Sequence, residues 1–143
     1  MVIAIQMELK VFNCRFIVPE EHYDNRGKLL VFEGLRSVPF EIKRVYTVSN
    51  VARDAVRGMH AHIRLRQLIV CLTGSCKLLL DDGVCRQVVT LETSRVGLYI
   101  GEYIWREMFD FSWDCILMVL ASELYDAGDY IHNYKKFLEI IKR

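Results

Sequence analysis

The sequence lacks the features that mark most proteins that bind nucleic acid or enter a membrane. Its 19 basic and 18 acidic side chains give a formal net charge of +1, so neither sign is in excess. No apolar run approaches the roughly 20 residues that span a bilayer. The apolar start, residues 1–5, is too short for a signal-peptide core. We therefore expect a cytoplasmic protein that binds neither nucleic acid nor membrane.

The cysteines lack the spacing of a metal or redox motif. There are five, an odd number, and no two are spaced Cys-x-x-Cys. Most lie inside apolar runs such as residues 69–72 and 115–118. Cysteines in such runs usually behave as small, buried hydrophobic residues, and in the reducing cytosol they remain free thiols.

Short candidate strands separated by turn signals fill most of the chain. They recur at the spacing of about 8–12 residues that is typical of a β-sandwich or barrel. No long helical period interrupts them, which argues against βαβ units. A final helix is expected over residues 129–142, capped by Asp129, because apolar residues recur there every three or four positions. The sequence thus predicts one all-β domain, residues 1–143, with a C-terminal α-helix. The expected strands lie in residues 2–16, 29–32, 41–48, 76–80, 85–91, 97–101, 104–111 and 114–121.

Two histidines, His60 and His62, lie two residues apart in a segment that we expect to continue as a strand over residues 63–74. Side chains alternate between the faces of a strand, so His60, His62 and Arg64 would share one face. Two imidazoles side by side in a cavity suit either metal ligation or proton transfer.

A His-x-His pair on a strand before a glycine turn is also how cupins begin a metal site. In cupins a glutamate a few residues on and a later histidine usually complete the site. Here those positions fall at Arg66 or its neighbour Gln67, and at Arg106. A fixed cation beside a divalent ion is unfavourable, and two imidazoles alone bind a metal weakly. We expect no metal and no other cofactor, although Glu102 and Glu107 could still complete a metal site.

The same region suits acid–base chemistry. An unperturbed imidazole has a pKa of about 6.5, close to the cytosolic pH. Tyr46, expected on one strand face with Arg44, could donate a hydrogen bond to a carbonyl or an enediolate. On these residues alone, His60 and His62 could equally be ordinary hydrogen-bonded histidines. Guanidinium groups pair well with phosphate oxygens, and the arginines that could hold an anionic substrate are Arg44, Arg57, Arg64 and Arg106.

Several blocks of the sequence carry a resemblance to a known family. They are residues 39–46, 57–62, 67–76, 80–83, 96–101, 105–108 and 119–122. Together they resemble the sugar-nucleotide 3,4-ketoisomerases, small cupins that act on dTDP-4-dehydro-6-deoxyglucose. The resemblance extends from about residue 13 to about residue 134. It implies a small cupin or jelly-roll barrel that needs no metal and forms a homodimer, often by exchanging N-terminal strands.

The resemblance also implies a reaction, in which the ketone of a dTDP-linked 4-keto-6-deoxy sugar moves from C4 to C3. A base takes the C3 proton, an enediol forms, and a proton returns at C4. The family's catalytic residues match His60, which we assign as the base, His62 and Tyr46. Its arginines that bind the diphosphate or stabilise the enediolate match Arg44 and Arg57. The block that contains Trp105 and Arg106 is specific to the family, so both are expected to contact the substrate.

The residues Arg26 and Gly27 match the branch of the family that forms a galacto-configured product. We therefore expect dTDP-3-dehydro-6-deoxy-D-galactose, a precursor of a deoxyaminosugar of surface glycans. The chain departs from the family at Arg106 and Phe109, where histidines are common. The alternatives are a gluco-configured 3-keto product, a sugar-nucleotide 3,5-epimerase, and a non-catalytic cupin that binds a sugar nucleotide.

Overall fold

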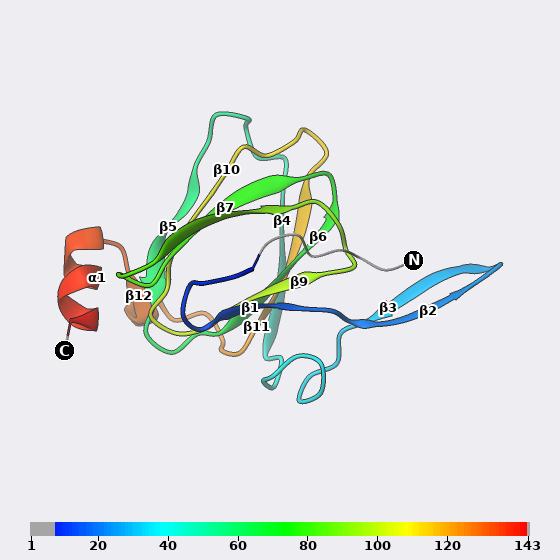
Figure 1. Cartoon of the computed structure of the whole chain (residues 1–143), viewed down its shortest axis with the longest axis horizontal. Coiled ribbons are helices and arrows are strands. Elements are labelled where there is room, and N and C mark those ends of the chain that lie inside the picture. Colours follow the sequence, from blue (N-terminus) through cyan, green and yellow to red (C-terminus); the bar gives the residue numbers. More distant parts are fainter. Residues whose placement is uncertain (1–7, 143) are drawn as a thin grey trace.

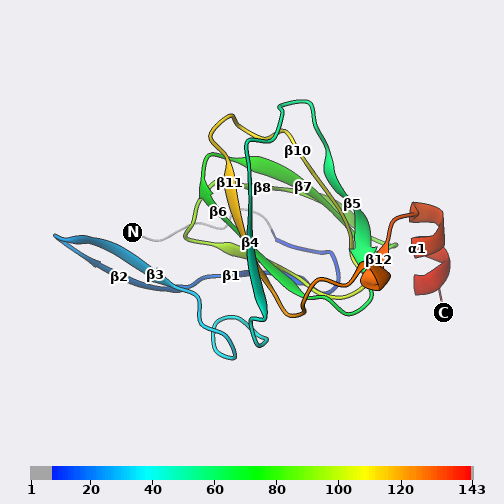
Figure 2. The same cartoon turned by 180° about the vertical axis from the view of Figure 1, so that it is seen from behind.

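Two five-stranded antiparallel sheets face each other and form the body of the protein in the computed structural model, which describes residues 8–142 (Figures 1 and 2). In spatial order, the first sheet consists of β1 (Cys14–Ile17), β9 (Gly97–Ile100), β6 (Gln67–Thr73), β11 (Ile116–Ala121) and β4 (Arg44–Ser49). The second consists of β12 (Tyr130–Ile131), β5 (Arg57–His62), β10 (Trp105–Phe109), β7 (Cys76–Asp81) and β8 (Arg86–Leu91). The predicted all-β fold with a C-terminal helix is confirmed.

The alternation of side chains along the strands builds the core between the two sheets. On β7, Cys76, Leu78 and Leu80 point inward and are almost completely buried, whereas Lys77 and Leu79 between them are only partly buried. They pack against inward residues of β6, β9 and β11. The outer face of β6 and β11 is covered as well, because Val38 and Phe40 of the loop before β4 lie over it. Burial on both faces explains why residues 68–71 form a continuous apolar run.

Most predicted strands are confirmed, but the strand expected over residues 63–74 is interrupted. The second sheet's strand β5 ends at His62, and β6 of the first sheet begins only at Gln67. Between them, the backbone N–H groups of Arg64 and Leu65 donate to the Asp129 carboxylate instead of pairing with a strand. Contrary to the prediction, Arg64 consequently does not share a strand face with His60 and His62. Its side chain is exposed and forms an ion pair with Asp126.

The C-terminal helix, α1, is shorter than predicted and covers Tyr134–Ile141. Its N-cap is Asn133, whose side chain accepts the Lys136 N–H. The predicted cap at Asp129 is wrong, because this carboxylate is buried and bound to the β5–β6 connection. Before α1, a short 3₁₀ helix, η1 (Ala127–Asp129), leads into β12, which pairs with β5. Among the described residues, no helix has the length and apolar character that crossing a bilayer requires.

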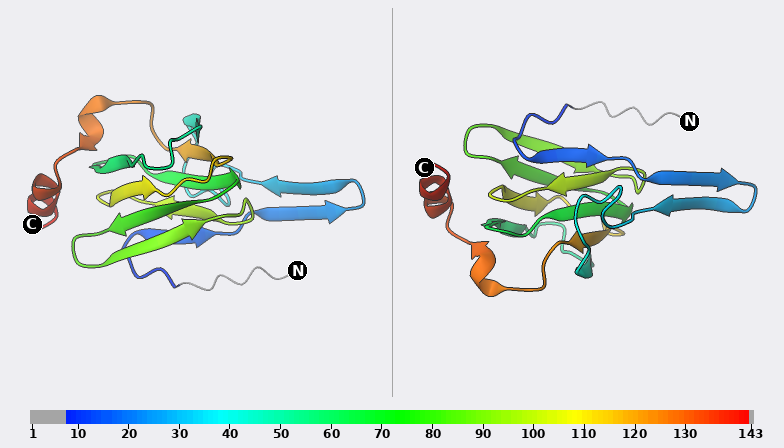
Figure 3. Two further views of the ribbon diagram at one scale, coloured as in Figure 1. Left: turned by 90° about the horizontal axis from the view of Figure 1, so that it is seen from above. Right: turned by 90° about the horizontal axis from the view of Figure 1, so that it is seen from below.

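A hairpin extends away from the body at the end opposite to α1 (Figures 1 and 3). It consists of β2 (Glu20–Asp24), which was not predicted, and β3 (Gly27–Val31), joined by the predicted turn. Its side chains are mostly exposed, including those of Tyr23 and Leu29, which are 76% and 58% exposed. The segment predicted as a strand before β1 lies partly in residues 1–7, outside the described residues.

The cap of α1 provides a test of the observed helix boundary. Replacing Asn133 with Ala removes the acceptor for the Lys136 N–H, so the free energy of unfolding should fall by about 1 kcal/mol and Tm by about 3 °C. Asn133→Asp keeps an acceptor at the same position and should remain near the wild type. Thermal and urea unfolding of the three proteins would reveal this pattern; an Ala variant as stable as the wild type would contradict the assigned cap.

Candidate active site

His60 and His62 point to the same side of β5, as the sequence predicts, with their ring centroids 4.7 Å apart. The strand is irregular just before them, where Gly58 and Met59 have positive φ angles of 84° and 56°. The register between β5 and β10 shifts at the same place and leaves Arg106 directly opposite His60. A side chain at residue 58 would meet the Arg106 carbonyl oxygen at 3.0 Å, so glycine permits this close approach.

Each imidazole has one nitrogen held by a group that can only accept a hydrogen bond. The Nδ1 atom of His60 lies 2.9 Å from the Gly58 carbonyl oxygen, and that of His62 lies 3.2 Å from a carboxylate oxygen of Asp129. Both Nδ1 atoms must therefore carry the proton of the neutral ring. The Nε2 atoms are left with a free lone pair, which a general base requires.

A buried guanidinium group lies beside this pair. The side chain of Arg106 donates from Nε to the Ile104 carbonyl oxygen at 3.1 Å and from Nη1 to the Gln67 side chain. Its Nη2 atom is buried and has no partner among the described residues. A cation so placed needs either a ligand or a further acceptor, because an unpaired buried polar group is costly.

Burial and the Arg106 charge keep both histidines neutral. Burial is the larger cause and the nearby guanidinium the second; together they lower the pKa of His60 to about 4 and that of His62 to about 2. Burial also lowers the pKa of Arg106 itself to about 10, well above neutral pH. At pH 7 the two imidazoles are therefore neutral and lie beside the fixed positive charge of Arg106.

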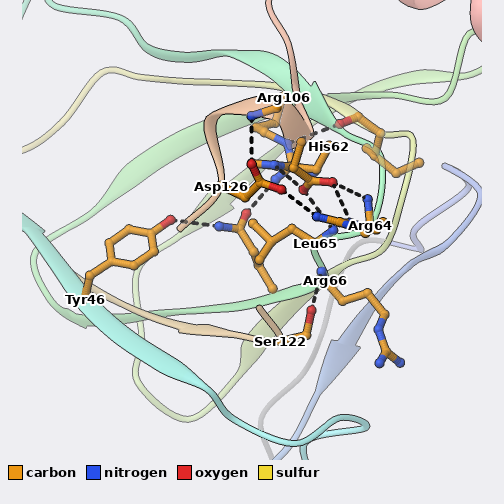
Figure 4. Close-up of polar contacts among 12 residues, drawn as sticks. Tyr46, His62, Arg64, Leu65, Arg66, Arg106, Ser122 and Asp126 are labelled. Atoms are coloured by element: carbon orange, nitrogen blue, oxygen red, sulfur yellow. Dashed lines mark hydrogen bonds and ion pairs between the residues drawn. The ribbon is translucent and has the colours of Figure 1, made fainter. Parts of the chain in front are cut away.

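Tyr46 and Arg44 reach the site from β4 of the opposite sheet. They share the inner face of the strand with Val48, which confirms the predicted alternation. The Tyr46 hydroxyl accepts a hydrogen bond from Gln67 Nε2 at 2.7 Å, and it points toward Arg106 and His62 (Figure 4). Burial raises the pKa of the phenol, so Tyr46 is a protonated donor at neutral pH. The Arg44 guanidinium lies over the rings of Tyr46 and Tyr125.

The other sequence-predicted residues lie elsewhere in the chain. Trp105 is buried on the opposite face of β10 from Arg106, where it packs against Tyr134 and Phe137 of α1. Arg57 is exposed at the start of β5. Arg26 and Gly27 lie at the tip of the β2–β3 hairpin, remote from the histidines, and Arg26 is paired with Asp24. Within one chain, the structure does not bring these residues to the site.

Four residues that sequence reasoning did not place at the site surround the histidines. Asp129 holds His62, and Gln67 connects Arg106 with Tyr46. The ring of Tyr130 lies 4.9 Å from His60 and 4.4 Å from His62. His132 stacks on Tyr130 at 5.3 Å and lies 6.0 Å from His60. The spacing of apolar residues after Asp129 mimicked a helix, which concealed three of the four.

The two glutamates considered as additional metal ligands bind other groups. Glu102 accepts a hydrogen bond from the Asn13 side chain, and Glu107 accepts one from the Trp105 indole. Within residues 8–142, no group of three or more His, Cys, Asp or Glu side chains is arranged to hold a metal ion.

The fold and this site together define a small cupin-type barrel with the groups for acid–base chemistry in its interior. A family described as "WxcM-like, C-terminal" (FdtA) matches residues 12–142, and the chain belongs to this family. A TDP-4-oxo-6-deoxy-α-D-glucose-3,4-oxoisomerase from Aneurinibacillus thermoaerophilus is 47% identical over 137 residues, which cover 96% of this chain and 95% of the relative.

Two solved structures are similar over nearly their whole length. A histidine-to-asparagine variant of the 3,4-ketoisomerase QdtA from Thermoanaerobacterium thermosaccharolyticum, in complex with TDP-4-keto-6-deoxyglucose, is 42% identical with a TM-score of 0.89. The alignment covers 92% of this chain and 96% of that one. The TDP-quinovose 3,4-ketoisomerase WlaRB from Campylobacter jejuni is 43% identical with a TM-score of 0.87, covering 90% and 99%.

The lowered pKa values of the histidines predict a loss of stability in mild acid. An unfolded histidine titrates near 6.5, so between about pH 4 and 6.5 the unfolded chain binds more protons than the native protein. The free energy of unfolding should therefore fall as the pH is lowered from 7 to 5, by the order of 1 kcal/mol per imidazole after allowance for solvent screening.

Urea unfolding at several pH values measures this dependence. The variant His60→Asn removes one of the two groups and should lose less stability than the wild type over the same range. Equal slopes for the two proteins between pH 7 and pH 5 would show that His60 titrates normally in the folded state.

Proposed function

We propose that this protein is a 3,4-ketoisomerase of a dTDP-linked sugar that converts dTDP-4-dehydro-6-deoxy-D-glucose to a 3-keto isomer. The observation that carries the proposal is the pair of neutral imidazoles with fixed tautomers, His60 and His62, beside the buried Arg106 and a protonated Tyr46. The substrate class is supported by the relatives, whose names state this reaction or this ligand.

In the first step, His60 Nε2 takes the proton from C3 and the electron pair moves through the new C3–C4 double bond onto the C4 oxygen. The resulting enediolate carries its negative charge where Tyr46 can donate a hydrogen bond. The unpartnered Nη2 of Arg106 provides a fixed positive charge for the same intermediate. The proton on the C3 oxygen is transferred to the C4 oxygen, and return of a proton to C4 as the C3 carbonyl forms gives the 3-keto product with a hydroxyl at C4. His60 is favoured over His62 as the base because it is the less buried ring and its pKa of about 4 lies closer to neutral pH.

We assign Arg44 as the residue that binds the diphosphate of the dTDP-linked substrate. Its Nε atom is buried and has no hydrogen-bond partner among the described residues, so the guanidinium is available to an anion. It lies between the rings of Tyr46 and Tyr125, at 5.3 and 5.7 Å. Such a guanidinium can donate two parallel hydrogen bonds to phosphate oxygens. We keep Arg57 as a second candidate, since it is exposed on the same strand as the histidines.

A homodimer would cover the exposed hairpin. A two-stranded hairpin is marginally stable alone in water, yet β2 and β3 extend from the body with Tyr23 and Leu29 exposed. Docking against a second copy would bury these side chains and could bring Arg26 and Gly27 to the partner's site. The compartment proposed is the cytoplasm, where the five free cysteines would stay reduced.

We propose the galacto configuration at C4 of the product, on the basis of Arg26 and Gly27. A specific observation favours the gluco alternative: Arg106 replaces a histidine that is common in the family, and a relative 43% identical is named for TDP-quinovose, a 6-deoxyglucose. The two products differ in the coupling between H4 and H5, which is small in the galacto and large in the gluco isomer. Proton NMR of the product therefore distinguishes them, and a large coupling would overturn the galacto assignment.

The reaction itself is tested by incubating the purified protein with dTDP-4-dehydro-6-deoxyglucose and recording proton NMR spectra. A new set of 3-keto sugar signals is expected. Signals of a 4-keto epimer would instead indicate a 3,5-epimerase. An unchanged spectrum with saturable binding of the substrate would indicate a non-catalytic binding protein.

The role of His60 predicts that His60→Asn reduces kcat by roughly 10²–10⁴-fold, the usual contribution of a general base. Asparagine can still hydrogen-bond in the site but cannot accept the C3 proton at neutral pH. Melting temperature and dTDP affinity, measured by calorimetry, should change little. Turnover within a few fold of the wild type would remove His60 from this role.

A further inference from the structure

A chain of three side chains connects the two sheets through the site. Arg106 on β10 donates from Nη1 to the Gln67 Oε1 atom at 2.5 Å. Gln67, on β6, in turn donates from Nε2 to the Tyr46 hydroxyl on β4 at 2.7 Å. Gln67 is 4% exposed, so water does not compete for either hydrogen bond.

The chemistry of these groups permits only one direction for the chain of hydrogen bonds. A guanidinium has donors and no acceptor, so the oxygen of the Gln67 amide must face Arg106. The amide nitrogen then faces Tyr46, and since it can only donate, the phenol oxygen must accept. The hydroxyl proton of Tyr46 is therefore free, and the described residues offer it no acceptor. It is available to a substrate oxygen.

The direction depends on the residue at position 106. An acceptor or an apolar side chain there would let the Gln67 amide turn over. Its oxygen would then face Tyr46 and accept the phenol proton. The hydroxyl would offer the substrate a lone pair in place of a proton.

We propose that Gln67 is a positioning residue that, oriented by Arg106, makes Tyr46 a hydrogen-bond donor to the oxygen that becomes negative in the enediolate. The inference rests on the proposed ketoisomerase function. It adds a specific task for Gln67 and a second task for Arg106, beyond the charge that Arg106 places beside the histidines.

The variant Gln67→Glu tests this directly. A carboxylate accepts from both neighbours, so Arg106 stays paired while the Tyr46 proton is drawn away from the substrate. We expect kcat to fall by roughly 10²-fold, about as much as in Tyr46→Phe, because both remove one donor to the oxyanion. KM should change little. The double variant Q67E/Y46F should be no slower than the slower of the two single variants.

The comparison of the double variant with the two single variants separates a positioning role of Gln67 from a direct effect of the new carboxylate on the histidines. If the new carboxylate acted on the histidines, it would slow the Y46F protein further and move the acid limb of the pH–rate profile. Additive losses, such a pH shift, or wild-type kcat in Q67E would each overturn the proposal. Should Q67E fold poorly, Gln67→Met removes the amide without adding charge. The kcat of the double variant Q67M/Y46F should be no lower than that of Y46F. An additive loss of kcat would again overturn the proposal.

A matched control is Tyr134→Phe. Tyr134, the first residue of α1, also donates a hydrogen bond, to Asp81 at 2.6 Å, but on the outer side of the second sheet. Its loss should leave kcat unchanged. Wild-type turnover is measured first: no conversion of dTDP-4-dehydro-6-deoxyglucose would overturn both the function and this inference, whereas conversion with additive losses would overturn the inference alone.

Discussion

The burial of the Arg106 guanidinium between the two sheets is the constraint on which the rest of the site depends. A charge inside a protein is tolerated only where dipoles or counter-charges compensate for lost water. Here a backbone carbonyl and the Gln67 amide provide two acceptors, and one nitrogen finds no partner within residues 8–142. The two imidazoles remain neutral beside it, because their own burial and, second, this cation lower their pKa values. A neutral base next to a fixed positive charge is a suitable environment for forming an enediolate.

The fold provides this arrangement by joining parts of the chain that are distant in sequence. The irregular backbone at Gly58 and Met59 places His60 opposite Arg106, and the β5–β6 connection binds Asp129, which orients His62. The opposite sheet contributes Gln67 and Tyr46. The helix α1 covers the outer face of β10, so Trp105 supports the strand from behind and Arg106 faces the interior.

Alternation along single strands was enough to predict part of the site. It placed His60 with His62 and Arg44 with Tyr46, because each pair lies within one strand where period-two geometry applies. It failed for Arg64, because β5 ends at His62 once the Asp129 carboxylate takes the next backbone N–H groups. Asp129, Tyr130 and His132 were missed since their spacing resembles a helix, whereas pairing of β12 with β5 prevails in the folded chain. Arg26 lies at the hairpin tip, and the contribution proposed for it requires a second chain, which alternation within one strand cannot reveal.

The position of solvent-derived hydrogen in the product tests the central claim most directly. The reaction is run in D₂O with dTDP-4-dehydro-6-deoxyglucose, and the label is located by proton NMR. Proton removal at C3 and return at C4 predict a 3-keto product with deuterium at C4. Deuterium at C3 and C5 of a sugar that keeps its ketone at C4, or recovery of unchanged, unlabelled substrate, would contradict the account.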